Sequence, residues 1–409
     1  MRTLQAIDWD FALPRSGYVG PPHWYPGTFV PALSDALIEA LTPLGGTVFD
    51  PYGGIGTTGW SAIRASRSCH IADVNPVAIL TSYVTTSLLA LRRADPDVAT
   101  AALGALGQAI GRTDDLFGTT SAGGSAALDQ TIAALASPTP DQLTRSILAG
   151  PPRWELLKPW IAAETITQLS SLMEGIAKSN SQYVRLIGLC MASATARSVS
   201  SQHASWGHIA DNVRPREMKV HDVTAATTRW IKRTRAFVQF RMTPATRGGT
   251  DPTAAVHRRD WSQPGSAGAG DAHLLLTSPP YADAIDYTLA QRLSLYLLGY
   301  DDDAIRDLVA GEIGARRKRS KSTSRVKWSE QLCGAISDQL SWLRPEASIC
   351  LVLPHKESGR REGEDDLKAS LERLGWRLFF ERDRSIHQSH TRQSWTSIKR
   401  ETILVFKPG

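Results

Sequence analysis

The spacing of apolar residues predicts alternating helices and strands near the N-terminal end of the chain. Apolar positions recur at helical intervals over residues 31–41, and a short apolar run at 47–49 leads into a glycine-rich turn at 50–56. A second helical pattern follows at 57–65, and a second short strand at 69–72 ends at an aspartate. This order of helices and strands is typical of one unit of an α/β sheet.

The same alternation returns in the C-terminal part of the chain. The expected elements are, in order, a strand at 273–277, a helix at 285–298, a strand at 349–353, a helix at 367–374, and two strands at 376–381 and 402–406. Because strands and helices alternate in both outer segments, we expect an α/β fold with one mostly parallel sheet.

The middle of the chain is predicted to be mainly helical. Residues 85–140 are rich in Ala, Leu, Gly and Ser, and residues 151–240 have helical spacing, whereas residues 243–270 are rich in Gly, Pro and Ser apart from a short expected strand near 257–260. We therefore divide the chain into an N-terminal part of the sheet domain at 1–85, a helical insertion at 86–250, and the C-terminal part of the sheet domain at 251–409.

The composition is that of a soluble globular protein, with 42% hydrophobic and 21% charged residues. No apolar run approaches the length of a membrane span, and the first ten residues lack the apolar core of a signal peptide. We therefore expect a cytoplasmic protein with no membrane partner. The four cysteines have neither CxxC spacing nor paired histidines beside them, so we expect no metal site and no disulfide framework.

The formal net charge is +6, and part of it is concentrated in one short stretch. That stretch contains Arg316, Arg317, Lys318, Arg319 and Lys321 among serines. A solvated surface loop is one interpretation. Contact with the phosphates of a nucleic acid is the other, and it is favoured only if the chain carries a nucleic-acid chemistry elsewhere.

The first candidate site is the glycine-rich turn from Asp50 to Thr58. Glycines let a ligand lie against the backbone, and the helix that follows offers free N–H groups. The turn is not the dinucleotide fingerprint GxGxxG, and it lacks the lysine of a phosphate loop. Asp50 at a strand end suits a ligand that carries an ammonium group, and Asp73, at the end of the next strand, suits two ribose hydroxyls. The alternative is a tight turn that binds nothing.

The second candidate site is the sequence from Thr277 to Tyr281, Thr-Ser-Pro-Pro-Tyr, directly after a predicted strand. Two prolines there can neither continue a sheet nor start a helix in the ordinary way, so they form a stiff corner. A flat heterocycle with an amino group would stack on Tyr281 and donate hydrogen bonds to Ser278 and to the Pro279 carbonyl. These bonds would make the amine nucleophilic towards a methyl sulfonium without a covalent intermediate. A proline-stiffened turn with a buried tyrosine is the alternative.

Taken together, the two sites give the chain its resemblance to the S-adenosylmethionine-dependent DNA amino-methyltransferases, which act on cytosine N4 or adenine N6. The turn at 50–58 resembles their DPFxGxGTT cofactor motif, with Tyr52 in place of Phe, and residues 278–281 resemble their SPPY or DPPY catalytic motif. Residues 23–31 are similar to their HxYPxxFxPxL segment, residues 72–78 to their D-x-N-P-x-A, and residues 399–408 to their closing strand. The resemblance covers roughly residues 20–85 and 255–409 and implies a Rossmann-like methyltransferase sheet.

The resemblance also implies a role for individual residues. The cofactor S-adenosyl-L-methionine would be bound by Tyr25, Phe29, Asp50, Tyr52, Gly53, Gly54, Gly56, Thr57, Thr58, Asp73, Asn75 and Asp260. The match at Asp260 is loose, and a surface aspartate is the alternative. The target base would be held by Ser278, Pro279, Pro280 and Tyr281. No cysteine follows a proline, so the Pro-Cys nucleophile that methylates a ring carbon of cytosine is absent.

The substrate stays open at this point. A serine at position 278, where most adenine enzymes carry Asp or Asn, favours cytosine N4, and adenine N6 is the alternative. The cofactor motif precedes the catalytic motif, which differs from many cytosine N4 enzymes. RNA or tRNA base-amine methylation is a further alternative, although no RNA-binding module is recognisable. An inactive DNA-binding subunit is the last, and the intact motifs argue against it.

Residues 200–215 form a polar segment of the predicted insertion that suits contact with DNA. Among them, His203, Trp206 and Arg214 are of the types that contact bases and phosphates. A polar loop that closes over the cofactor is the alternative. The expected partner is double-stranded DNA, from which the enzyme would flip the target base, and a cognate restriction or defence-system protein is a second candidate partner.

Overall fold

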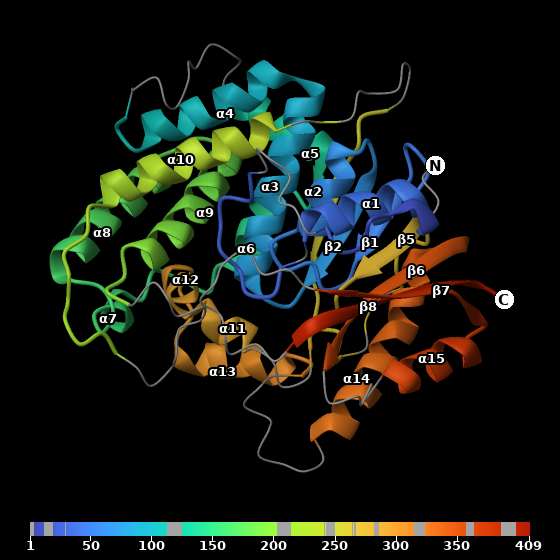
Figure 1. Cartoon of the computed structure of the whole chain (residues 1–409). Coiled ribbons are helices and arrows are strands. Elements are labelled where there is room, and N and C mark those ends of the chain that lie inside the picture. The colour runs from blue at the N-terminus through green and yellow to red at the C-terminus, as the bar shows by residue number, and fades with distance from the viewer. Residues whose placement is uncertain are drawn as a thin grey trace.

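A computed structural model describes the molecule over most of its length. The residues described are 4–11, 19–28, 30–112, 125–202, 214–240, 242, 250–263, 265, 267–281, 286–314, 324–356, 364–385 and 398–409. The described N-terminal segment and the C-terminal strand lie on the right of the molecule in Figure 1. The N-terminal segment contacts the last strands, since the rings of Trp9 and Phe380 are 5.4 Å apart and Ser385 N donates to Asp10 Oδ1 at 2.9 Å.

The strands of the described residues form one sheet. They are β1 (Thr47–Asp50), β2 (Ser68–Asp73), β3 (Ala136–Ser137), β4 (Ala254–Arg258), β5 (Ala272–Thr277), β6 (Leu343–Lys356), β7 (Trp376–Ser385) and β8 (Ile398–Pro408). Their order in space is β3-β4-β2-β1-β5-β6-β8-β7. All pairs from β3 to β6 are parallel, and β8 is antiparallel to both β6 and β7. The prediction of an α/β fold with a Rossmann-like, mostly parallel sheet is confirmed.

The helices pack on the two faces of this sheet and extend well beyond it. They are η1 (Leu4–Ala6), α1 (Pro31–Leu41), α2 (Thr57–Arg64), α3 (Pro76–Ala94), α4 (Pro96–Ala109), α5 (Ser125–Leu135), α6 (Pro140–Ile147), α7 (Trp154–Leu157), α8 (Ala163–Ala177), α9 (Gln182–Ser198), α10 (Val223–Gln239), α11 (Tyr287–Ala290), α12 (Arg292–Leu297), α13 (Asp302–Gly311), α14 (Ser324–Gln339), η3 (Leu340–Trp342) and α15 (Glu364–Arg373). None of these helices is both long and apolar enough to cross a bilayer.

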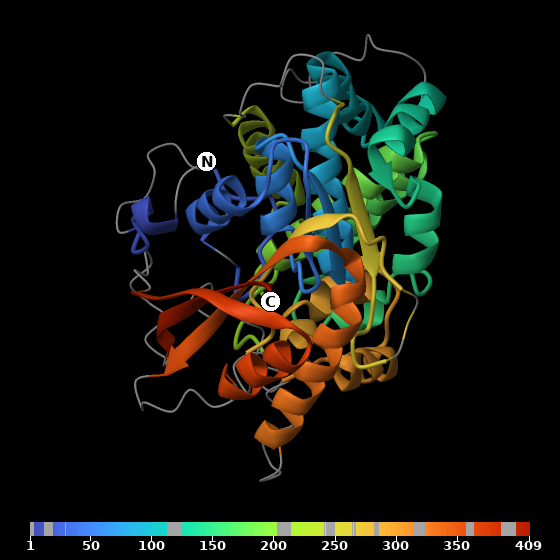
Figure 2. The same ribbon diagram turned by 90° about the vertical axis from the view of Figure 1, so that its right-hand side faces the viewer.

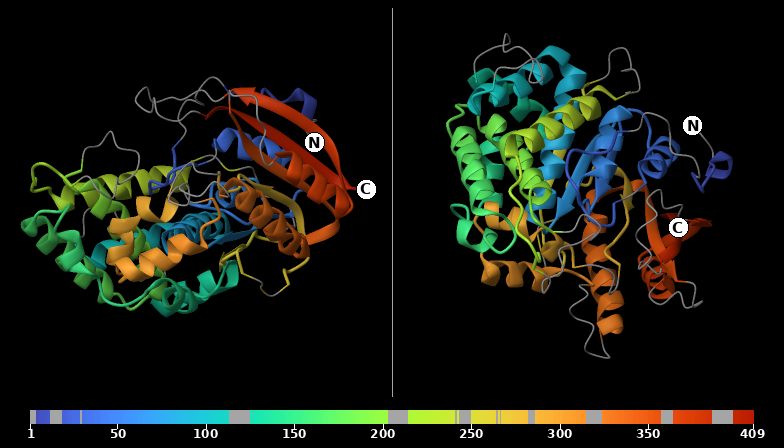
Figure 3. Two further views of the ribbon diagram at one scale, coloured as in Figure 1. Left: turned by 90° about the horizontal axis from the view of Figure 1, so that it is seen from below. Right: turned by 60° about the vertical axis from the view of Figure 1, so that its left-hand side comes forward.

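The sheet separates two hydrophobic cores because successive side chains of a strand face opposite sides. Val48 of β1 belongs to the core that α1, α2 and α3 cover. Its neighbour Phe49 belongs to the core that α14 and α15 cover, and its ring stacks on Trp342 at 4.7 Å. Figure 2 shows α14 and α15 below the curved strands β6, β7 and β8. The view from below in Figure 3 (left) shows the helices from α4 to α10 gathered toward the left, away from β7 and β8.

The predicted helical insertion is confirmed as helical, and the structure joins it closely to the sheet. The helix α3 crosses the predicted boundary at residue 85, and β3 pairs with β4 at Ala136↔Ala254. One continuous core contains residues from both parts, including Val84 and Leu88 of α3. The division at residues 85 and 250 therefore remains a prediction about function, because no separate packed body begins there.

Several predicted elements differ from the structure in their bounds, and two of them lie beside the predicted motifs. The strand expected near 257–260 is β4 at Ala254–Arg258, because it pairs with β2 in the register Cys69↔Ala254 to Asp73↔Arg258. The helix expected at 285–298 is described from 286 on as α11 and α12, which are separated at Gln291. Gln291 donates through Nε2 to the carbonyl of Trp24 at 3.0 Å.

Candidate functional site

The predicted motifs meet at the carboxyl ends of the central strands. The chain continues from β1 to β2 and β4 on one side, and from β5 to β6 on the other, so the order of strands reverses between β1 and β5. In open α/β sheets, ligands bind in the crevice outside such a reversal. Asp50 ends β1, Asp73 ends β2, and Ser278 directly follows β5.

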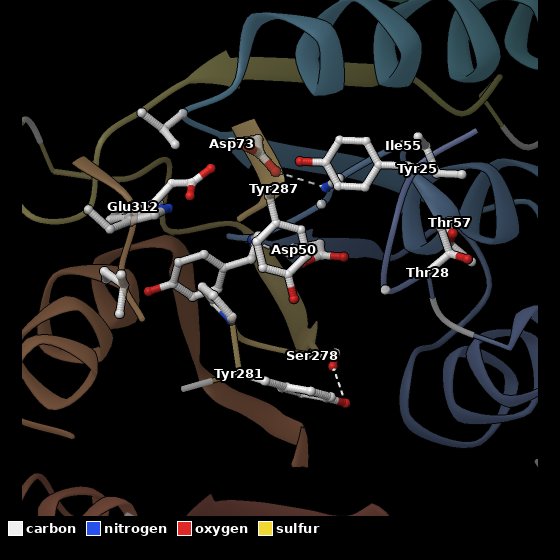
Figure 4. Close-up of a pocket in the computed structure, with 18 of the residues that line it drawn as sticks. Tyr25, Thr28, Asp50, Ile55, Thr57, Asp73, Ser278, Tyr281, Tyr287 and Glu312 are labelled. Carbon is white, nitrogen blue, oxygen red and sulfur yellow. Dashed lines mark hydrogen bonds between the residues drawn. The ribbon is translucent and has the colours of Figure 1, made fainter. Parts of the chain in front are cut away.

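A pocket with about 880 Å³ of empty space opens at this position. This volume includes space that is open to solvent, so the lining residues define the site. The predicted residues that line it are Tyr25, Asp50, Tyr52, Gly53, Gly54, Thr57, Asp73, Ser278, Pro280 and Tyr281. Figure 4 shows most of them around one cavity, with Asp73 and Tyr25 at one edge and Ser278 and Tyr281 at the other.

Asp50 is a buried carboxylate with neutral hydrogen-bond partners. Its Oδ1 accepts from Thr277 Oγ1 at 2.7 Å and from Tyr52 N at 3.1 Å. Burial raises the pKa of Asp50 to about 6, the hydrogen bonds oppose that shift, and no described cation contributes to it. A ligand with a positive charge would supply the counter-charge that the described residues do not.

Asp73 holds the glycine-rich turn in place. Its Oδ2 accepts from Gly54 N and its Oδ1 from Asn75 N, both at 2.9 Å. Burial raises the pKa of Asp73 to about 6, against the effect of these two backbone donors. Asn75 does not line the pocket, since its side chain caps α3 by accepting from Val77 N at 2.9 Å.

The glycines of the turn have different surroundings, and the cofactor role of Gly56 stays a prediction. Gly56 has a φ of +84°, and a Cβ there would lie 3.0 Å from Ser82 Cα, so Gly56 faces α3 and does not line the pocket. A Cβ on Gly53 would meet Ile71 of β2 at 2.1 Å, although the Gly53 backbone lines the pocket. Only at Gly54 does the missing Cβ face another pocket residue, the ring of Tyr25 at 3.3 Å.

A chain of hydrogen bonds connects the catalytic motif to the closing strands. Ser278 Oγ donates to Tyr281 Oη at 2.8 Å, and Tyr281 Oη donates to Glu401 Oε1 at 3.2 Å. Arg384 Nη1 donates to Glu401 Oε2 at 2.6 Å, in a salt bridge between paired positions of β7 and β8. Burial raises the pKa of the Glu401 carboxyl, and Arg384 opposes that rise. The hydroxyl of Tyr281 is therefore held from both sides.

Two other residues that line the pocket, Tyr287 and Glu312, were not predicted from the sequence. Tyr287 lies against Tyr25 with ring centroids 6.2 Å apart, and Glu312 lines the pocket at the end of α13. Glu312 Oε1 accepts from Thr288 N at 2.6 Å and from Thr288 Oγ1, and burial raises the pKa of this carboxyl to about 7. No local motif marks either residue, so the sequence offered no signal for them.

Some of the predicted cofactor and catalytic residues are not among the residues that line the pocket. Asp260 does not line it, and its Oδ1 accepts from Ser262 N at 2.8 Å, whereas its neighbours Arg259 and Trp261 do line it. Trp261 Nε1 donates to the Pro51 carbonyl at 2.7 Å, which fixes this ring beside the turn. Thr58 and Pro279 are likewise absent from the lining. Phe29 lies outside the described residues.

Most of the predicted DNA contacts also fall outside the described residues. This applies to His203, Trp206, Arg316, Arg317, Lys318, Arg319 and Lys321. Arg214 is described and exposed. The described residues contain no cluster of three or more side chains that would bind a metal ion. None of the four cysteines lines the pocket, and three of them are buried elsewhere in the fold.

Comparison with known proteins yields matches among solved structures and no sequence match. No family model matches the chain, and no curated protein matches it. The chain is similar to the rRNA methyltransferase aviRa from Streptomyces viridochromogenes, with 12% sequence identity and a TM-score of 0.30, over 95% of this chain and 91% of that one.

Proposed function

We propose that the protein is an S-adenosylmethionine-dependent DNA methyltransferase that acts on an exocyclic base amine, with cytosine N4 as the preferred target. The observation that carries the proposal is the meeting of both sequence motifs in one pocket. Asp50, Gly54 and Asp73 line one part of it, and Ser278 and Tyr281 line another. Such a pocket brings a methyl donor and a flat heterocycle close enough to react.

The charges of the pocket fit this cofactor. Asp50, Asp73 and Glu312 line it, against the single cation Arg259 among the described lining residues. S-Adenosylmethionine carries a sulfonium and an ammonium against one carboxylate, so it would bring a net positive charge. Asp50 would bind the ammonium and Asp73 the ribose hydroxyls, while Tyr25 and Trp261 offer aromatic faces to the adenine. When bound, the cofactor supplies the methyl group.

The residues of the catalytic motif would prepare the base. Ser278 Oγ donates its hydrogen bond to Tyr281 Oη, so the lone pairs of Oγ can accept a hydrogen bond from the base amine. Tyr281 Oη in turn donates to Glu401, so the charged pair of Glu401 and Arg384 would fix the ring on which the base stacks. Trp328 Nε1 donates a hydrogen bond to the Pro280 carbonyl at 2.9 Å. The Pro279 carbonyl is therefore the second candidate acceptor for the base amine.

The proposal is tested by the product. Purified protein is incubated with duplex DNA of mixed sequence and deuterated S-adenosylmethionine, and the digested DNA is examined by mass spectrometry. We expect labelled N4-methylcytosine, with N6-methyladenine as the outcome that would correct only the target base. The Ser278→Ala and Tyr281→Ala variants serve as controls and should lose most of the product. Labelled 5-methylcytosine, or label in RNA and none in DNA, would refute the proposal.

A further inference from the structure

A second pocket lies next to the first and has a different chemical character. It holds about 1,130 Å³ of empty space between α9, α10 and the segment around Pro22, and α9 and α10 run side by side in Figure 1. Its lining includes Arg197, Arg229 and Arg233 together with Trp24 and Trp230. No acidic side chain is among the described residues that line it. The pocket is therefore strongly positive.

His23, directly behind the pocket, responds to this positive charge. Its Nε2 is 2.8 Å from Ser193 Oγ and its Nδ1 is 2.8 Å from the Trp24 carbonyl. The pKa of His23 is lowered to about 4, mainly by burial and further by the charges of Arg197 and Arg233. Two arginines thus act on the same point, and the histidine between them stays neutral at physiological pH.

Arg197 is arranged as an anchor for an anion. Its guanidinium carbon lies 3.3 Å from the ring centroid of Trp24, and burial lowers its pKa to about 10. Among the described residues, no acidic side chain pairs with it, and Nη1, which is shielded from solvent, has no hydrogen-bond partner. A planar guanidinium held by a ring loses little freedom when it binds a phosphate through two parallel N–H donors.

The helix α10 adds further cations on the same side. Ala226, Arg229, Trp230 and Arg233 are spaced three and four residues apart, so they share one face of the helix, and all four line the pocket. Arg229 and Arg233 are exposed at this surface. The face combines two arginines with the apolar side chains of Ala226 and Trp230. This combination suits the backbone of a nucleic acid more than a free ion.

One segment of chain separates the two pockets. Trp24 lines the second pocket and the next residue, Tyr25, lines the first. The Trp24 carbonyl is held by Gln291 Nε2 at 3.0 Å, so the segment is fixed between them. The two pockets therefore adjoin at the edge of the first pocket that Tyr25 lines.

We infer that the second pocket binds a phosphodiester of the DNA strand that carries the target nucleotide, with Arg197 as its principal contact. This inference rests on the proposed function, since it assigns a place to the backbone of the proposed substrate. Contacts of this kind position the strand without reading its sequence. They also hold the backbone when the base leaves the duplex, which stabilises the flipped state.

The first test compares the salt dependence of DNA binding in Arg197→Gln and the wild type. Fluorescence anisotropy with a labelled duplex gives the affinity at several salt concentrations. A lost phosphate contact lowers the slope by about 0.9, so a fourfold rise in salt should weaken the wild type about 3.5-fold more than the variant. Lys232→Gln is the matched control, because Lys232 is an exposed cation of α10 that does not line the pocket. Equal slopes for Arg197→Gln and wild type would overturn the inference.

The second test locates the contact directly on the wild-type protein. Phenylglyoxal modifies accessible arginines, and peptide mass spectrometry reports the modification of Arg197 with and without duplex DNA. We expect DNA at saturating concentration to protect Arg197 and inorganic phosphate at the same phosphate concentration to leave it reactive. Unprotected Arg197 in a DNA-bound protein would overturn the inference. A wild type that methylates DNA while Arg197 stays reactive would refute this inference alone and leave the proposed function standing.

Discussion

Replacing Asp50 by Asn should make the cofactor-free protein more stable at pH 8 while it weakens binding of the cofactor. Asp50 is 2% exposed, and burial raises its pKa from 3.8 to about 6. For an acid with a raised pKa, the stability that the protonated form provides is complete below pH 3.8 and is lost as the pH rises through about 6. At pH 8 the buried charge therefore costs about 3 kcal/mol, because each unit of pKa corresponds to about 1.4 kcal/mol.

The amide oxygen of Asn can still accept from Thr277 Oγ1 and Tyr52 N, so the substitution removes the charge with little change of shape. The free energy of unfolding is measured by denaturant titration at pH 4 and pH 8 for both proteins without cofactor. About 0.6 kcal/mol of the cost of the buried charge is already present at pH 4, because the unfolded carboxyl is more than half ionised there, so the advantage of Asp50→Asn should be about 2.4 kcal/mol larger at pH 8 than at pH 4. The pH 4 measurement removes any constant effect of the amide NH₂, since the wild-type carboxyl is protonated there.

Calorimetry measures the cofactor side of the same prediction. Loss of a hydrogen bond between charged groups should weaken S-adenosylmethionine binding by about 10- to 150-fold, which is 1.5–3 kcal/mol. Methylthioadenosine has no ammonium, so both proteins should bind it equally. Wild-type affinity for S-adenosylmethionine should also fall below about pH 6, as Asp50 takes up a proton. A variant that binds S-adenosylmethionine as the wild type does, or that gains no stability at pH 8, would refute the reasoning.

Two further predictions concern the hydrogen-bond chain and the turn. Tyr281→Phe keeps the stacking ring but cuts the link from Ser278 to Glu401, so turnover should fall about tenfold while DNA affinity stays. In the Tyr281→Phe background, Glu401→Gln should then cause no further loss of turnover. Additive losses of turnover in a double-mutant cycle would show that Glu401 acts elsewhere. Gly56→Val should destabilise the fold by at least about 2 kcal/mol in thermal denaturation, because a branched residue at φ +84° also meets Ser82. An unchanged melting temperature with lost cofactor binding would support the predicted cofactor role of Gly56.

The sequence by itself determined the features that depend on neighbours in the chain. Apolar runs and helical spacing were enough for the main strands and helices, because burial of one face sets the period of each element. The turn after Asp50 and the corner at Pro279 and Pro280 were also readable, since glycine and proline restrict the backbone locally. Asp50, Asp73 and Ser278 were found as chemistry at strand ends, and the parallel sheet brings such ends to one edge.

The tertiary structure decided which of these residues face the pocket. Asp260 was predicted, yet its neighbours Arg259 and Trp261 line the pocket, because the register of β4 on β2 sets which side chains point inward. Gly56 was predicted to face the ligand, but α3 packs against it. A shift of one residue along a strand moves a side chain to the opposite face, and a motif match does not fix the register to one residue.

The tertiary structure alone also supplied the partners that come from distant parts of the chain. Glu401 reaches Tyr281 because β8 lies next to β6 and β7 pairs beside it, and Arg197 lies on Trp24 because α9 packs near the N-terminal segment. Neither contact leaves a local pattern, since each joins residues more than a hundred positions apart. Local preferences act over a few residues, whereas strand order and helix packing are set by burial over the whole chain. Which charged side chains pair is therefore decided only when the chain is folded.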